Sequence, residues 1–291
     1  MHESSPPYPP IVLAVLGIAL LCGILLFVQD TQRPRESLSS LSSLTLHTER
    51  PPAFAAAAPD VASSTEKVRI PILAYHIVRP SYPSDDRAVR DLAQTPEVFD
   101  AQMQYLADAG YHVISFGELE NYLKSGKPLP KNPILITLDD GWSNQYTYAF
   151  PILKKYHYPA TFFVFTNSIG TRGFLTWDNL RTLHNAGMTI GSHTRSHPFL
   201  TKVTNPAALW DEIDGSKQKI EKELGITVHE FAYPFGMYDP AIVELVKKAG
   251  YTSARGDYYA GGKQSVSLLY ELNALNAPIT TTLFAKMFPP R

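Results

Sequence analysis

The sequence predicts an α/β fold: a distorted (β/α) barrel of about seven parallel strands, preceded by an N-terminal transmembrane helix. Three observations support the barrel. Apolar runs alternate with amphipathic stretches over residues 67–291, the runs are continuously apolar, and helix-capping residues stand between them. Continuous apolar runs indicate strands buried on both faces, as in parallel sheets. Repetition of strand and helix over this length favours a closed barrel, with a doubly wound open sheet as the alternative.

The predicted elements follow one another along residues 67–291, which we take as a single domain. The apolar runs predict strands at residues 70–75, 112–115, 134–138, 160–166, 188–191, 230–233 and 251–254. A capping Thr, Asn or Asp, in most cases followed by proline, marks the start of a helix, and a glycine marks its end. The clearest helices, from capping residue to glycine, span residues 95–110, 176–187, 205–225 and 239–250.

The N-terminal part has a different composition. Residues 1–10 form a short tail, and residues 11–28 contain no charge and reach the length that spans a bilayer. Residues 29–66 are rich in Ser, Pro, Ala and Thr, as in flexible linkers. We interpret residues 11–28 as an uncleaved membrane anchor, with a cleaved signal peptide as the alternative. Arg33 and Arg35 follow this segment, and the positive-inside rule would therefore place the C-terminal part in the cytoplasm.

The overall composition is that of a globular protein with almost no net charge. The 291 residues include 26 Lys and Arg and 27 Asp and Glu, which gives a formal net charge of −1. Without a basic field, nucleic acid is not an expected partner, and no feature implies a protein partner. The single cysteine, Cys22, lies in the apolar N-terminal segment. An intrachain disulfide and a thiolate metal site in the globular domain are therefore excluded.

Polar residues follow several predicted strands at their carboxyl ends. Asp139 and Asp140 come directly after the third strand, and His193 and His197 follow the fifth. His76 follows the first strand. Because the carboxyl ends of parallel barrel strands meet at one rim, where barrel enzymes carry their active sites, we expect these side chains to lie close together.

These two motifs have the composition of a mononuclear metal site. Two histidines four residues apart can face one ion. Adjacent carboxylates repel each other, and a divalent cation offsets that repulsion. One carboxylate can then bind the metal while the other remains free to accept a proton from water. The sequence therefore predicts a hydrolase that uses a single divalent cation.

The motifs resemble those of the NodB-homology polysaccharide deacetylases, also called carbohydrate esterase family 4. The resemblance rests on PILAYH at residues 71–76, TLDDG at 137–141, PATFFV at 159–164 and SHTRSH at 192–197. It implies a distorted (β/α) barrel and the removal of N-acetyl groups from a polysaccharide. It also implies one divalent metal ion, usually zinc.

The same resemblance implies roles for individual residues. Asp139 is the general base, and Asp140, His193 and His197 bind the metal. The metal polarises the acetamide carbonyl and lowers the pKa of a bound water molecule. The backbone N–H of Phe235 helps the metal to hold the tetrahedral oxyanion.

Further residues resemble the branch that deacetylates poly-N-acetylglucosamine. FLTWD at residues 174–178 and the end of the first strand at His76 carry this likeness. Trp177 is expected to stack on a sugar ring, and its alternative is a packing role at a helix start. Tyr233 is also expected to contact the substrate. His76 either takes part in the reaction or supports the site structurally.

The chain departs from the family pattern at two places. Ala232 occupies the position where the family commonly has an arginine that orients the base. Arg255, after the last predicted strand, could replace it from another strand end, with a surface salt bridge as the alternative. The family's late Leu-x-His motif supplies a general acid, but the corresponding residues 275–277 read Leu-Asn-Ala. The general acid is therefore left without an assignment.

The expected function is a membrane-anchored, metal-dependent N-deacetylase whose partner is an N-acetylated hexosamine polymer. Such a polymer lies outside the cytoplasmic membrane. We give this location more weight than the orientation that Arg33 and Arg35 indicate. We therefore expect a single-pass membrane protein with an extracytoplasmic catalytic domain, or a secreted protein if residues 11–28 are cleaved. The alternatives are a carbohydrate-binding pseudoenzyme that retains its metal site and a metal-dependent deacetylase of a small substrate.

Overall fold

A closed ring of parallel strands forms the centre of the domain. The computed structural model describes residues 67–256 and 263–290. In this part of the chain the ring runs in the order β2, β12, β10, β9, β8, β7, β6 and back to β2. Its members are β2 (Ile72–Tyr75), β6 (Pro133–Leu138), β7 (Thr161–Val164), β8 (Thr189–Ser192), β9 (Glu230–Ala232), β10 (Ser253–Gly256) and β12 (Leu272–Asn276). The pairing of β2 with β6 closes the barrel and excludes the open sheet.

All seven predicted strands are present, and their ends lie within two residues of the predicted ends. The ring, however, does not consist of these seven strands: one of them lies outside it. β5 (His112–Val113) pairs with the first residues of β6 and stays outside the ring. β12 takes the remaining place, between β2 and β10. Its sequence, LNALN, is not a continuous apolar run, and for this reason it was missed. The side chain of Asn273 is accommodated by donating to the Lys263 carbonyl at 2.9 Å.

Short strands and helices complete the domain. β1 (Val68–Arg69) pairs with β11 (Lys263–Gln264), and β3 (Ile77–Val78) pairs with β4 (Ala93–Gln94). The α-helices are α2 (Arg87–Leu92), α3 (Pro96–Asp108), α4 (Phe116–Ser125), α5 (Phe150–Lys155), α6 (Trp177–Asn185), α7 (Pro206–Trp210), α8 (Ser216–Leu224), α9 (Pro240–Lys248) and α10 (Thr281–Met287). Shorter 3₁₀ or π turns are η2 (Gln145–Ala149), η3 (Leu200–Lys202), η4 (Asp211–Gly215), η5 (Pro234–Gly236) and η6 (Val266–Leu268).

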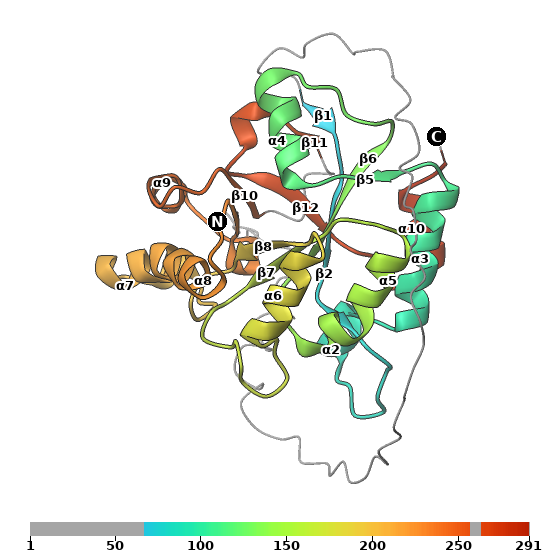
Figure 1. Ribbon diagram of the computed structural model, residues 1–291, viewed down its shortest axis with the longest axis horizontal. Helices are drawn as coiled ribbons and strands as arrows, with labels where there is room; N and C mark the ends of the chain where they lie inside the picture. Colours follow the sequence, from blue (N-terminus) through green and yellow to red (C-terminus); the bar gives the residue numbers. More distant parts are fainter. Residues whose placement is uncertain (1–66, 257–262, 291) are drawn as a thin grey trace, which may run out of the picture. The chain divides into compact units, whose positions relative to one another are not determined.

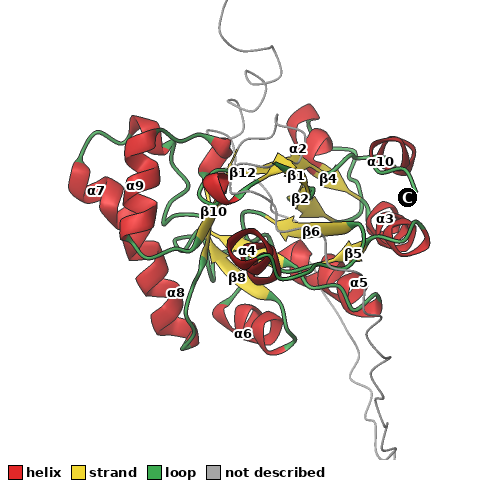
Figure 2. Cartoon of the chain, turned by 90° about the horizontal axis from the view of Figure 1, so that it is seen from above, coloured by secondary structure: helices red, strands yellow, loops and turns green. Residues whose placement is uncertain are grey.

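Three of the four helices predicted from capping residues are confirmed, and the fourth, predicted over residues 205–225, consists of α7, the π turn η4 and α8. The side chains of Thr95, Thr176, Asn205 and Asp239 each accept a backbone N–H at the start of α3, α6, α7 and α9. Such caps satisfy the N–H groups that lack a partner in the first turn. Figures 1 and 2 show α7, α8 and α9 on one side of the ring and α3, α5 and α10 on the other.

Alternation along the strands divides the core into an outer layer and a barrel interior. On β2, Leu73 and Tyr75 belong to the cluster that includes the surrounding helices, whereas Ile72 and Ala74 belong to a second, smaller cluster. The second cluster draws residues from strands all around the ring and from α4, which lies over one end of the ring in Figure 2. Because successive side chains point to opposite faces, every second strand residue faces the barrel interior.

The N-terminal ends of the strands hold a buried acidic residue with a testable effect on stability. Burial, with a smaller contribution from the Glu120 carboxylate, raises the pKa of Glu230 from 4.5 to about 7. Glu230 therefore stabilises the folded state most below about pH 4.5, and this contribution is lost as the pH rises to about 7. We expect Glu230→Gln to remove this pH dependence of the unfolding free energy, which is on the order of 3 kcal/mol. Urea unfolding at pH 4.5 and pH 8 measures it.

The control for this prediction is Glu244→Gln, since Glu244 lies on α9 with its side chain 71% exposed. The difference in unfolding free energy between pH 4.5 and pH 8 should change for Glu230→Gln only. An equal pH dependence in both variants would contradict the assignment to Glu230.

The predicted N-terminal segments lie outside the described residues. This applies to the tail at residues 1–10, the anchor at residues 11–28 and the linker at residues 29–66. Within residues 67–256 and 263–290, none of the helices combines the length and the apolar composition needed to cross a membrane.

Candidate active site

The two sequence motifs meet at the carboxyl end of the ring. Asp139 directly follows β6, and its N–H donates to the Tyr75 carbonyl at the end of β2, at 2.8 Å. His193 directly follows β8, and its N–H donates to the Val164 carbonyl at the end of β7, at 2.9 Å. The register of the parallel pairs thus brings both motifs to the same rim.

A tight turn separates the two neighbouring carboxylates. Asp140 has φ +71° and Gly141 has φ +73°. A Cβ atom at Gly141 would lie 3.0 Å from Val164 Cγ1, so that the turn requires both the freedom and the small size of glycine. The Asp139 side chain is fully buried, whereas that of Asp140 is 17% exposed. The turn therefore gives two adjacent carboxylates different environments.

Asp140, His193 and His197 place three possible ligand atoms within 4.8 Å of one another. The two histidine Nε2 atoms are 3.1 Å apart. Asp140 Oδ1 lies 3.4 Å from His197 Nε2 and 3.7 Å from His193 Nε2. His193 Nδ1–H donates to the Ala232 carbonyl at 2.7 Å. Because a carbonyl only accepts, this bond leaves the lone pair of His193 Nε2 available for a metal.

Burial keeps both imidazoles in the form that binds metal. It lowers the pKa of His193 from 6.5 to about 4, and it also lowers the pKa of His197. Neutral imidazole nitrogens and a carboxylate oxygen are a ligand set suited to zinc and related divalent cations. Within the described part of the chain, this is the cluster of three such groups that could hold an ion. The residues therefore fit the metal that the sequence predicts.

Asp139 is paired with a buried cation. Arg255 Nη2 donates to Asp139 Oδ1, and both side chains are fully buried. Burial alone would raise the pKa of Asp139, but the positive charge of Arg255, followed by the nearby imidazoles, outweighs it and holds the pKa below 3.8. Asp139 is therefore ionised at neutral pH, as a general base must be.

Arg255 reaches Asp139 from β10, through the barrel interior. Its guanidinium carbon lies 4.7 Å above the centre of the Phe163 ring, which fixes it from the other side. The structure thus pairs Arg255 with the base, and it excludes the alternative of a surface salt bridge because both side chains are fully buried. Ala232, at the family's usual arginine position, contributes its carbonyl to His193 instead.

His76 is a further neighbour of the base. Its Nε2 is 3.8 Å from Asp139 Oδ2, and its side chain is 14% exposed. Asp139 Oδ2 is buried and accepts no hydrogen bond from the described residues. The His76 imidazole therefore lies next to Asp139 Oδ2, the oxygen of the base that accepts no hydrogen bond from the described residues.

The predicted substrate-binding residues differ in position. Phe235 lies at the site, with φ +60° and its ring 4.6 Å from that of His197. Tyr233 is fully buried, and its hydroxyl donates to the Tyr270 carbonyl at 2.9 Å, so a packing role is favoured over the predicted substrate contact. Trp177 packs against the outer core at the start of α6, with the Lys219 ammonium 5.7 Å from its ring. This contact favours its packing alternative.

Trp142 is a site residue that the sequence analysis missed. Its indole Nε1–H donates to Asp140 Oδ2 at 3.1 Å. The signal that could have found it is its place two residues after Asp140, where a turn folds the side chain back onto the motif.

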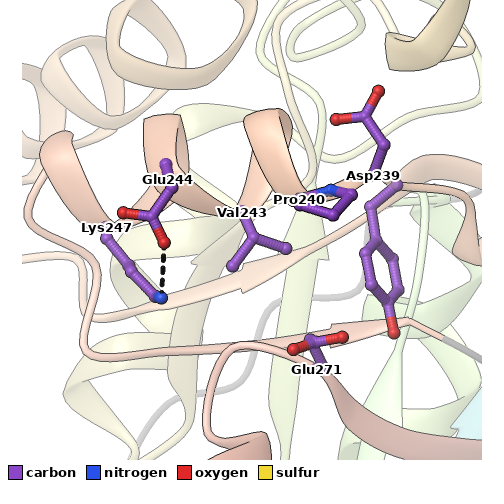
Figure 3. A pocket seen from close by; sticks show the side chains of 7 residues that line it. Asp239, Pro240, Val243, Glu244, Lys247 and Glu271 are labelled. Atoms are coloured by element: carbon purple, nitrogen blue, oxygen red, sulfur yellow. Dashed lines mark hydrogen bonds and ion pairs between the residues drawn. The ribbon is translucent and has the colours of Figure 1, made fainter.

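A separate hollow of about 210 Å³ lies beside α9 (Figure 3). Three of its polar side chains have partners, since Lys247 Nζ is 2.7 Å from Glu244 and Asp239 caps α9. None of the predicted site residues lines it, and we assign no catalytic role to it. Its lining residues are Tyr238, Asp239, Pro240, Val243, Glu244, Lys247 and Glu271.

Comparison with known proteins identifies relatives by sequence. The profile of the family described as polysaccharide deacetylase matches residues 126–254. YxkH of Bacillus subtilis is 31% identical over 188 residues, which cover 64% of this chain and 64% of YxkH. The Staphylococcus epidermidis protein named poly-beta-1,6-N-acetyl-D-glucosamine N-deacetylase is 30% identical over 200 residues, which cover 61% of this chain and 68% of that protein. The chain thus spans a little under two thirds of YxkH.

The chain is also similar to a solved deacetylase structure. The Streptococcus pyogenes deacetylase PplD, in complex with acetate, superposes with a TM-score of 0.70 and 27% sequence identity. The match covers 77% of this chain and all of that one. The region matched by the family profile contains both carboxylates of the turn and both histidines of the cluster. The chain belongs to the polysaccharide deacetylase family.

Proposed function

We propose that the protein removes N-acetyl groups from a polymer that contains N-acetylglucosamine. The observation that carries the proposal is the ionised Asp139, paired with Arg255 and adjacent to the cluster of Asp140, His193 and His197. The name of the Staphylococcus epidermidis relative supports the polymer. PplD was solved with acetate, which is the acid that hydrolysis of an N-acetyl group releases.

Asp140, His193 and His197 are the residues that would hold one divalent cation, which we propose to be zinc. When bound, such an ion polarises the amide carbonyl and makes a water molecule more acidic. Asp139 accepts the proton of the attacking water, and Arg255 keeps its carboxylate ionised and oriented. The backbone N–H of Phe235 donates to the oxygen that gains negative charge.

We propose that His76 donates the proton that the leaving nitrogen needs. When the amide C–N bond breaks, the nitrogen departs as an amine only after it has gained a proton. His76 Nε2 lies 3.8 Å from Asp139 Oδ2, and its side chain is 14% exposed. This role would replace the histidine of the missing late motif.

A leaving group that needs no proton tests this role. We expect His76→Gln to lower kcat for an N-acetylglucosamine oligomer by about 10²-fold, because acid catalysis of the amine's departure is lost. Hydrolysis of 4-nitrophenyl acetate should change little, because 4-nitrophenolate leaves without protonation. The matched control is His184→Gln, at an exposed position on α6. Equal losses on both substrates would contradict the role of His76 as an acid.

The proposed function is tested by acetate release from the full-length protein. Zinc-loaded protein should release acetate from β-1,6-linked N-acetylglucosamine oligomers, chelator should abolish the activity, and added zinc should restore it. Activity on the monomer alone would indicate a deacetylase of small substrates instead. Absence of acetate release from any oligomer, with either zinc or cobalt, would refute the proposal.

We also propose that residues 11–28 anchor the protein and that its catalytic domain faces the outside of the membrane, where such a polymer accumulates. Protease added to intact cells should then degrade the catalytic domain. Its protection in intact cells, together with degradation after lysis, would contradict this orientation.

A further inference from the structure

The two carboxylate oxygens of Asp140 have different partners. Oδ1 faces the Nε2 atoms of His197 and His193, at 3.4 and 3.7 Å. Oδ2 accepts the hydrogen bond from the Trp142 indole at 3.1 Å. Because an indole N–H donates and cannot accept, Trp142 holds this oxygen without competing for a cation. Oδ1 is therefore the oxygen turned toward the two imidazoles.

Trp142 is itself held in place by its ring and its backbone. The indole stacks on the Phe174 ring, with centroids 4.5 Å apart and an angle of 21° between the planes. The backbones of Trp142 and Phe174 form an antiparallel bridge. The flanking residues Gly141 and Ser143 exchange hydrogen bonds of 2.8 and 2.9 Å with residues 173–175. The indole N–H is thus presented to Asp140 by a rigid support from the loop after β7.

We propose that Trp142 is a positioning residue that holds Asp140 as a one-oxygen metal ligand. The inference rests on the metal site of the proposed function. Two ring nitrogens and one carboxylate oxygen leave the remaining coordination positions open to water and to the substrate carbonyl. A carboxylate that bound through both oxygens would occupy one of these positions. Hydrogen bonds to metal ligands commonly change metal affinity by about 10- to 100-fold.

The test compares two Trp→Phe variants of the full-length protein. Trp142→Phe keeps an aromatic ring to stack on Phe174 but removes the N–H that Asp140 accepts. We expect it to bind Zn²⁺ at least about tenfold more weakly than wild type, measured by competition with a chromophoric chelator. The visible spectrum of its Co²⁺ form should also change, since that spectrum reports coordination number. Trp210→Phe, on α7 beneath the Lys248 ammonium, should bind both metals as wild type does.

The outcomes separate this inference from the proposed function. Wild-type zinc affinity and an unchanged cobalt spectrum in Trp142→Phe would overturn the inference and leave the deacetylase proposal standing. Failure of the wild-type protein to bind zinc would overturn both. Acetate release is measured separately, so loss of activity without a change in zinc affinity also counts against a positioning role.

A second measurement leaves Trp142 unchanged and does not depend on the folding of that variant. Nitrogen-15 labelling of the tryptophans gives separate indole N–H signals, and Trp177→Phe and Trp210→Phe assign the Trp142 signal by elimination. We expect the Trp142 signal to shift when Zn²⁺ is added, because the oxygen it bonds belongs to a ligand. A Trp142 signal that stays in place while zinc binds would overturn the inference.

Discussion

Asparagine in place of Asp139 should lower kcat for acetate release by about 10²- to 10⁴-fold, because its amide cannot accept the proton of the attacking water. The side chain keeps its size and an oxygen that Arg255 can bond. The loss should therefore reflect missing proton transfer rather than a change in shape. The measurement is kcat at saturating zinc, with an N-acetylglucosamine oligomer as substrate.

Zinc binding is the control for this variant. Asp140, His193 and His197 remain in place, so the dissociation constant for zinc should stay close to that of wild type. The variant removes the negative charge that Arg255 contacts at Asp139, and breaking one buried ion pair can cost about 3–5 kcal/mol of stability. Rates are therefore compared at a temperature where circular dichroism shows both proteins folded. A kcat above a tenth of the wild-type value would rule out Asp139 as the general base.

Arg255→Met should destabilise the domain by about 3–5 kcal/mol at neutral pH. Methionine keeps an unbranched apolar side chain over the Phe163 ring but leaves the Asp139 carboxylate buried without its cation. The same change should lower kcat, because the base loses its orienting partner. Urea unfolding and initial rates measure the two effects separately.

The stability that Arg255→Met loses should depend on pH in a predictable direction. In wild type the pKa of Asp139 lies below 3.8, so the ion pair stabilises the fold fully above about pH 4 and less as the pH falls. In Arg255→Met, burial should instead raise the pKa of Asp139 above its unfolded value. Stability is then lost as the pH rises through that raised pKa. The difference in unfolding free energy between wild type and Arg255→Met should therefore grow from pH 4 to pH 8.

The chain offers a matched control in Arg181→Met. Arg181 pairs with Asp178 at 2.6 Å, but both side chains are largely exposed, so its loss should cost less than about 1 kcal/mol. The double variant Asp139→Asn with Arg255→Met should lose less stability than the two single losses combined, because both single variants break the same ion pair. If Arg255→Met costs no more than Arg181→Met, the buried pair does not stabilise the domain.

The positions of the two motifs could be predicted because the information is local. Asp139 directly follows an apolar run, His193 directly follows another, and parallel strands bring their carboxyl ends to one rim. The turn at Gly141 and the capped helices are likewise local features of a few residues. The strand positions and the meeting of the two motifs therefore followed from patterns within short segments, whereas the choice of Asp140 as the carboxylate ligand came from the resemblance to the family.

What could not be predicted depends on contacts between distant segments. β12 contains Asn273, whose buried side chain donates to the Lys263 carbonyl in β11, and it ends at the exposed Asn276, so its sequence lacks the apolar run of a buried strand. The pairing of Arg255 with Asp139 requires that β10 and β6 both turn these side chains into the barrel interior. The hydrogen bond from Trp142 depends on its support by Phe174, which follows a different strand. No periodicity in the sequence reports such contacts.

The place of β12 has a consequence for the synthesis of the protein. Along the chain β12 is the last strand of the ring, yet it lies between β2 and β10, so Ala274 must pair with Ile72. Until the ribosome has made β12, β2 and β10 each present an unpaired edge, and such edges can pair with other chains. Pairing between segments so far apart also slows folding. The domain is therefore expected to close only after its synthesis, when β12 takes its place between β2 and β10.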